Sequence, residues 1–134
     1  MPVRRSETLP IRSGADIVTA RQIVRTWCID VGFSLVDQTK MVTAASELAR
    51  NTLDYGRGGT IHLEQLDEGT RKGLRLVFAD SGPGIPDIDR ALQDGYTSGN
   101  GLGLGLGGAR RLVNEFHISS AVGEGTTVTI TRWK

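Results

Sequence analysis

The chain has 134 residues, of which 38% are hydrophobic and 23% charged, as is typical of a folded domain rather than a disordered segment. Sixteen lysines and arginines nearly balance fifteen acidic residues, so the net charge of +1 gives no reason to expect nucleic-acid or membrane binding. No apolar stretch approaches the roughly 20 residues that span a bilayer, and the N-terminus lacks the apolar core of a signal peptide, so we expect a cytoplasmic protein.

The predicted elements follow one another without a repeat or a linker, so residues 1–134 are predicted to form a single domain. An extended segment over residues 3–11 precedes a helix over residues 15–31, where apolar residues recur at helical spacing and Gly32 gives a stop signal. A second helix is predicted to begin after Asp37, interpreted as its N-cap, and to run to about Tyr55. Cys28, the single cysteine, is expected to be buried in the first helix.

The second half of the chain is predicted to contain two hairpins. Strands are expected over residues 60–66 and 74–79, and again over residues 117–122 and 126–133, with His62 and His117 on sheet faces. Between the hairpins we expect a short helix over residues 88–93 and another over about residues 108–116. This order predicts an α+β fold, a two-layer α/β sandwich with a mixed, mostly antiparallel sheet and helices on one face.

Glycine is concentrated in one part of the chain. Nine of the 18 glycines fall between Gly82 and Gly108. The run from Gly99 to Gly108 leads into a predicted helix, and successive backbone N–H groups before a helix can bind a di- or triphosphate. The run is not a P-loop, because no GxxxxGK[ST] motif occurs. A flexible loop without a ligand is the alternative reading.

Glu47 and Asn51 are four residues apart on the second predicted helix and so share one face. The amide oxygen of Asn51 is a suitable neutral ligand for Mg²⁺ beside substrate phosphates. The carboxylate of Glu47 can accept a proton from an attacking hydroxyl or water. An ordinary polar helix face would show the same spacing.

Asp80 ends a predicted strand and is followed by Gly82 and Gly84 in a loop rich in glycine and proline. A carboxylate there can accept a hydrogen bond from an exocyclic amine such as that of adenine, and the glycines would let a flat base approach the backbone. A tight turn in which the aspartate bonds its own backbone is the alternative.

These motifs occur in an order that resembles the GHKL superfamily. Within it, the chain is most similar to the anti-sigma serine/threonine kinases of the switch-kinase type found in the bacterial stressosome. The resemblance is carried by Ser46-Glu-Leu-Ala-Arg-Asn51, Asp80-Ser-Gly-Pro-Gly-Ile-Pro-Asp87, Gly101-Leu-Gly-Leu-Gly-Leu, Arg111-Leu-Val-Asn-Glu-Phe116 and Gly123-x-Gly125-Thr126-Thr127. It covers essentially the whole chain.

The resemblance implies an ATP-binding site. Asn51 would coordinate Mg²⁺ that bridges the phosphates, and Glu47 would be the general base. The residues implied to bind ATP are Asp80, Gly82, Gly84, Gly101, Gly103, Gly105 and Thr127. Asp80 would bind the adenine amine, the next two glycines would shape the base pocket, the other three would belong to a lid over the phosphates, and Thr127 would support the adenine end.

The resemblance also implies partners. Similar proteins phosphorylate serine or threonine on STAS-domain proteins and then bind and activate a PP2C-type phosphatase. No lysine or arginine lies between Gly95 and Gly105, so the predicted lid offers no cationic contact to the γ-phosphate. Two alternatives remain: a nucleotide-gated, anti-sigma-like binding protein that acts by sequestration and release, and an ATP hydrolase without a protein substrate.

Overall fold

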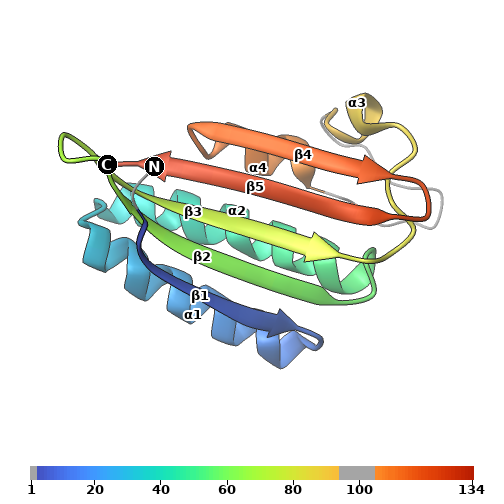
Figure 1. The fold of residues 1–134 in the computed structure, drawn as a ribbon, viewed down its shortest axis with the longest axis horizontal. Coiled ribbons are helices and arrows are strands. Elements are labelled where there is room, and N and C mark those ends of the chain that lie inside the picture. The colour runs from blue at the N-terminus through green and yellow to red at the C-terminus, as the bar shows by residue number, and fades with distance from the viewer. Residues whose placement is uncertain (1–2, 94–104) are drawn as a thin grey trace.

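The computed structural model describes residues 3–93 and 105–134. Along the chain, the elements are β1 (Val3–Ile11), α1 (Gly14–Val31), α2 (Leu35–Asp54), β2 (Gly59–Asp67), β3 (Lys72–Asp80), α3 (Ile88–Ala91), α4 (Leu106–Arg111), β4 (Glu115–Ala121) and β5 (Gly125–Trp133). The five strands form one sheet in the order β1-β2-β3-β5-β4, and every neighbouring pair is antiparallel. Helices α1, α2 and α4 lie against one face of the sheet (Figure 1). The predicted two-layer fold is confirmed, but the five strands form a wholly antiparallel sheet rather than the mixed one that was predicted.

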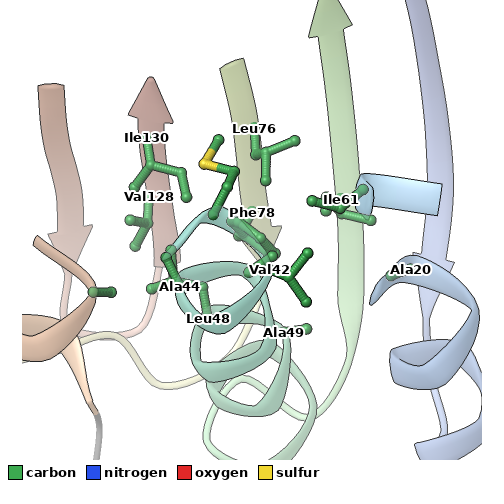
Figure 2. Packing of buried hydrophobic residues seen from close by; sticks show 14 of the residues in the cluster. Ala20, Val42, Ala44, Leu48, Ala49, Ile61, Leu76, Phe78, Val128 and Ile130 are labelled. Carbon is green, nitrogen blue, oxygen red and sulfur yellow. The ribbon is translucent and has the colours of Figure 1, made fainter. Parts of the chain in front are cut away.

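The hydrophobic core lies between the sheet and α1 and α2. Strand residues alternate between the two faces of a sheet, so every second side chain of β3 and β5 points toward the helices. Figure 2 shows Leu76, Phe78, Val128 and Ile130 facing α2, and each of these side chains is at most 5% exposed. Cys28 is buried in the same core, as predicted, and burial raises the pKa of its thiol to about 12.

Helix α2 begins earlier than the sequence indicated. Ser34, not Asp37, is the N-cap, and its side chain accepts a hydrogen bond from the Asp37 N–H at 3.2 Å. Both residue types are favoured at helix starts, and the structure uses the serine as the cap and the aspartate in the first turn, where its charge suits the helix dipole.

The helix predicted over residues 108–116 was also misplaced. Helix α4 spans Leu106–Arg111, and Phe116 instead lies in β4, opposite Ile130 of β5. The change of element occurs at Asn114, whose N–H donates to the Thr131 carbonyl and whose side-chain oxygen accepts from the Trp133 N–H. Pairing with β5 therefore ends the helical stretch that local spacing favoured.

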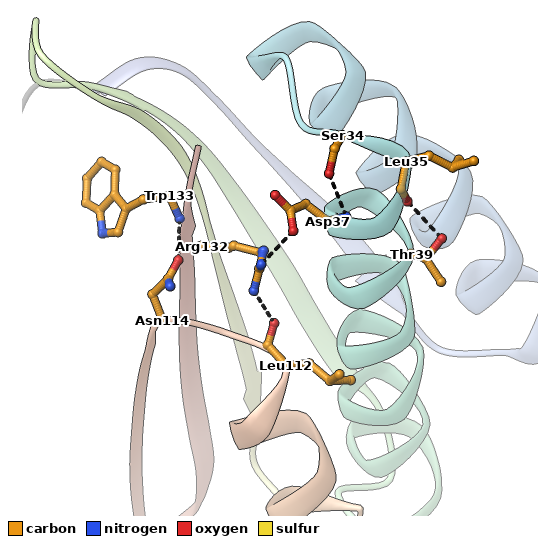
Figure 3. A network of polar contacts seen from close by, with 8 residues as sticks. All are labelled: Ser34, Leu35, Asp37, Thr39, Leu112, Asn114, Arg132 and Trp133. Carbon is orange, nitrogen blue, oxygen red and sulfur yellow. Dashed lines mark hydrogen bonds and ion pairs between the residues drawn. The ribbon is translucent and has the colours of Figure 1, made fainter.

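Arg132 ties α4 to the rest of the fold. Its guanidinium donates to the Asp37 carboxylate of α2 at 2.6 Å and to the Leu112 carbonyl at the end of α4 at 2.8 Å (Figure 3). The Arg132 side chain is 14% exposed and the Asp37 side chain 30% exposed, so the ion pair is partly shielded from water. This link holds the C-terminal end of α4 against both α2 and β5.

Candidate functional site

A narrow cavity lies where β3 ends and β5 begins, against the C-terminal half of α2. Most of its lining is apolar or aromatic, with a few polar groups among it. The lining residues are Leu48, Asn51, Thr52, Tyr55, Phe78, Asp80, Ile85, Leu106, Thr126 and Val128. The cavity volume is about 20 Å³, which is about the space of one water molecule.

Helix α2 supplies one wall of this cavity. Leu48, Asn51, Thr52 and Tyr55 follow the i, i+3, i+4, i+7 spacing that places residues on one helical face. Glu47 lies one turn before Asn51 and is exposed, at the edge of that face rather than within the cavity. The predicted pair is thus arranged with Asn51 inside the cavity and Glu47 outside it.

Gly105 brings the end of the glycine run next to Glu47. A Cβ added to Gly105 would lie 2.5 Å from the Glu47 Oε2 atom, and the glycine has a left-handed φ of +63°. The left-handed φ favours glycine at this position, whereas the exposed Glu47 carboxylate, at the end of a flexible side chain, could move away from an added Cβ. Gly101 and Gly103, the other predicted lid residues, lie outside the described residues.

Asp80 is the charged group of the cavity. Its Oδ1 atom accepts hydrogen bonds from the N–H groups of Gly82 at 2.9 Å and Thr126 at 3.2 Å. Burial raises the pKa of the Asp80 carboxyl above its ordinary value of 3.8, and these two hydrogen bonds offset part of the rise. Among the described residues, none donates a hydrogen bond to the Oδ2 atom, which lies close to the Gly56 backbone.

The two glycines after Asp80 pack closely against protein backbone, and their predicted part in shaping a base pocket stays a prediction. We expected them to leave room for a base, but protein backbone occupies the space beside both. A Cβ on Gly82 would lie 2.7 Å from the Gly56 Cα atom, and one on Gly84, whose φ is +78°, would overlap the Ala121 carbonyl. They let the loop pack closely and so hold Ile85 in the cavity wall.

Thr126, rather than Thr127, faces the cavity. Thr127 pairs with Ala79 and Ser119, and its side chain lies on the face of the sheet without helices. Thr126 shares the inward face with Val128 and Ile130, and this alternation was the sequence signal that could have identified it. Tyr55, whose hydroxyl donates to the Gly84 carbonyl at 2.7 Å, was also missed.

A second, wider hollow of about 520 Å³ also reaches Asp80. It lies beside the contact between Gly56 and Gly82 and is lined mainly by glycines and by small or polar residues: Gly56, Arg57, Gly58, Gly59, Thr60, Ala79, Asp80, Ser81, Gly82 and Pro83. Apolar and aromatic side chains that can stack on a flat ring line the narrow cavity instead. Size alone would favour the wider hollow, but the lining chemistry favours the narrow cavity as the place for a base.

Among residues 3–93 and 105–134, no group of three or more His, Cys, Asp or Glu side chains could hold a metal ion. Mg²⁺ that is bound together with substrate phosphates does not require such a group, because one or two protein ligands are enough. Within the same residues, no helix is long and apolar enough to cross a membrane.

Comparison with known proteins assigns this fold and site to a class. Residues 36–134 match the family described as histidine kinase-, DNA gyrase B-, and HSP90-like ATPase, and the chain belongs to that family. It therefore binds ATP. Over 118 residues the chain is 46% identical to the serine/threonine-protein kinase RsbT of Bacillus subtilis, covering 88% of this chain and 89% of that protein.

More distant relatives support the same assignment. An anti-sigma F factor of Thermoanaerobacter is 25% identical over 120 residues, covering 85% of this chain and 82% of that protein. A crystal structure of the RsbU and RsbW domains of a Mycobacterium tuberculosis protein superposes with a TM-score of 0.63 at 24% identity. The match covers 98% of this chain and 32% of that one, and it supports the fold alone.

Proposed function

We propose that the chain is a protein serine/threonine kinase that uses ATP and Mg²⁺. One observation carries the proposal: α2 has Asn51 in the lining of the cavity that ends at Asp80 and has Glu47 one turn earlier, exposed and outside the cavity. A base-binding pocket thus adjoins a metal-binding amide and a carboxylate. The 46% identity to a protein named as a serine/threonine kinase supports the same activity.

The chemical character of the cavity lining suits an adenine ring. Phe78, Ile85 and Val128 provide apolar surface for the ring, and the Asp80 Oδ2 atom accepts a hydrogen bond from the 6-amino group. Because the cavity volume is about 20 Å³, the ring enters only when a wall residue moves. Leu106, at the start of the short helix α4, is the wall residue that we expect to move.

Asn51 would hold the Mg²⁺ through its side-chain oxygen, and the metal when bound would neutralise charge on the transferring phosphoryl group. Glu47 accepts the proton of the attacking hydroxyl. Its exposed position suits this role, because a protein substrate must reach the γ-phosphate from outside the cavity. Positioning and electrostatic stabilisation supply most of the catalysis in phosphoryl transfer.

The substrates in this proposal are STAS-domain proteins of a stressosome, phosphorylated on serine or threonine, and the kinase afterwards binds and activates a PP2C-type phosphatase in the cytoplasm. The similarity to RsbT and to anti-sigma F factors supports partner switching of this kind.

The second candidate is a nucleotide-gated binding protein with little phosphotransfer. Two observations favour it: the similarity to anti-sigma factors, and the absence of lysine and arginine from the sequence between Gly95 and Gly105. Sequestration needs ATP binding but no general base.

Phosphosite mapping separates the two candidates. The chain is incubated with Mg·ATP and a purified STAS-domain assembly, and the assembly is then analysed by mass spectrometry. If the chain is a kinase, mass spectrometry should find stoichiometric phosphate on a serine or threonine of the assembly. Tight, ATP-dependent binding without any transferred phosphate would favour the binding protein and contradict the kinase.

A further inference from the structure

Ser120 of β4 joins the two walls of the cavity without lining it. Its side chain points to the helix-covered face, opposite Thr126 in the β4–β5 pairing. The Ser120 Oγ atom lies 2.8 Å from the Ile85 nitrogen, 3.0 Å from the Gly125 carbonyl oxygen and 2.8 Å from the Thr126 Oγ1 atom. Ile85 and Thr126 both line the cavity, whereas Ser120 does not.

Counting protons fixes the direction of each contact. A serine hydroxyl has one proton to donate and two lone pairs to accept with. The Ile85 N–H supplies the proton of the first contact, and only Ser120 can supply the proton to the Gly125 carbonyl. The contact with Thr126 is then a hydrogen bond only if Thr126 is the donor. This is the one assignment in which all three contacts are hydrogen bonds.

The assignment determines what Thr126 presents to a ligand. Its hydroxyl proton is used by Ser120 and its backbone N–H by Asp80, so Thr126, which lines the cavity, can act toward a ligand only as an acceptor. The Asp80 carboxylate beside it is an acceptor as well. Two neighbouring acceptors suit an exocyclic amine, which has two N–H groups, and oppose a carbonyl oxygen.

We propose that Ser120 is a positioning residue that makes the site select 6-aminopurine over 6-oxopurine nucleotides. It acts by holding the Thr126 hydroxyl as an acceptor and by fixing the backbone of Ile85 in the cavity wall. This inference rests on the proposed ATP site, and it adds a residue that contacts neither base nor phosphate. Without Ser120, the Thr126 hydroxyl rotates and can donate to a 6-oxo group.

The test compares the dissociation constants for ATP and GTP by calorimetry in four proteins: wild type, Ser120→Ala, Ser120→Thr and Ser119→Ala. Ser119 is the matched control, since it neighbours Ser120 but lies on the other face of the sheet, opposite Thr127. We expect Ser120→Ala to lower the preference for ATP over GTP about tenfold, the value of one hydrogen bond at the upper end of its usual range. Ser120→Thr keeps the hydroxyl and retains the preference, and Ser119→Ala leaves it unchanged.

Equal weakening of both nucleotides in Ser120→Ala would show a purely structural role and overturn the proposal. If that variant does not fold, Ser120→Cys, which keeps the size but hydrogen-bonds weakly, must lower the preference by a smaller factor; an unchanged preference overturns the proposal. Failure of the wild type to bind ATP would instead reject the proposed ATP site, so the two failures are distinguishable.

Discussion

Replacing Asp80 by asparagine separates nucleotide binding from stability. Asparagine has the same shape, and its Oδ1 atom can still accept the hydrogen bonds from the Gly82 and Thr126 N–H groups. The amide nitrogen takes the place of Oδ2, so a donor faces the adenine amine where the wild type offers an acceptor. Loss of a hydrogen bond to a charged group costs about 1.5–3 kcal/mol, so we expect ATP to bind about 10- to 150-fold more weakly.

The stability of the unliganded protein should change in the opposite direction. Because the folded-state pKa of Asp80 lies above its ordinary value of 3.8, folding favours the protonated carboxyl. The contribution of the protonated Asp80 carboxyl to the free energy of unfolding is fully present below the pKa that Asp80 has in the unfolded chain. It is lost as the pH rises through the pKa that Asp80 has in the folded protein. At neutral pH, Asp80→Asn removes a charge that folding disfavours, so its melting temperature should equal or exceed that of the wild type.

Calorimetry with ATP and GTP, together with thermal unfolding without nucleotide, measures both effects. The amide of the variant can donate to the 6-oxo group of guanine, so GTP binding should improve relative to ATP. Wild-type affinity for ATP in a folded Asp80→Asn protein would refute the assignment of Asp80 to the base. A large fall in melting temperature would refute the explanation of its raised pKa.

Two further substitutions test the packing around the site. Gly84→Ala places a Cβ against the Ala121 carbonyl at a φ of +78°, whereas Gly69 has the same φ with no heavy atom within 4 Å of an added Cβ. In urea unfolding, Gly84→Ala should therefore lower the free energy of unfolding by about 1–3 kcal/mol more than Gly69→Ala does. Equal losses in the two variants would contradict the close approach of Gly84 to the Ala121 carbonyl. Asp37→Asn removes the negative charge from the half-buried pair with Arg132 and should cost about 2 kcal/mol in the same assay, the usual value of a hydrogen bond to a charged group. Its control is Asp30→Asn, which breaks an exposed pair with Arg5 and should cost under about 1 kcal/mol.

The sequence predicted most of the fold because its periodicity is clear. The alternation in β2, β3 and β5 and the helical spacing in α1 and α2 are local properties, and the structure has these elements within a few residues of the predicted bounds. The bounds of elements were predicted wrongly where contacts with distant parts of the chain determine the secondary structure. Phe116 joins β4 because Ile130 lies opposite it, a contact that no local window contains.

The sequence predicted which types of residue form the site. It did not predict which face of a strand a residue lies on, or which residues support the cavity wall from behind. Asp80 and Asn51 do line one cavity. The resemblance predicts Thr127, but the inward positions of β5, continued back from Val128, lead to its neighbour Thr126. The role of Ser120 could not be predicted from the sequence, because its hydrogen-bond partners come from a loop 35 residues earlier and from the neighbouring strand.

The most direct test of the kinase assignment is phosphoryl transfer by Glu47→Gln, with nucleotide binding measured on the same preparation. Glu47 lies outside the base cavity, so the variant should bind ATP as the wild type does. Loss of the general base should slow transfer from Mg·ATP to a STAS-domain substrate by about 10²- to 10⁴-fold. Transfer at the wild-type rate, with ATP still bound, would contradict the role assigned to Glu47 and with it the proposed mechanism.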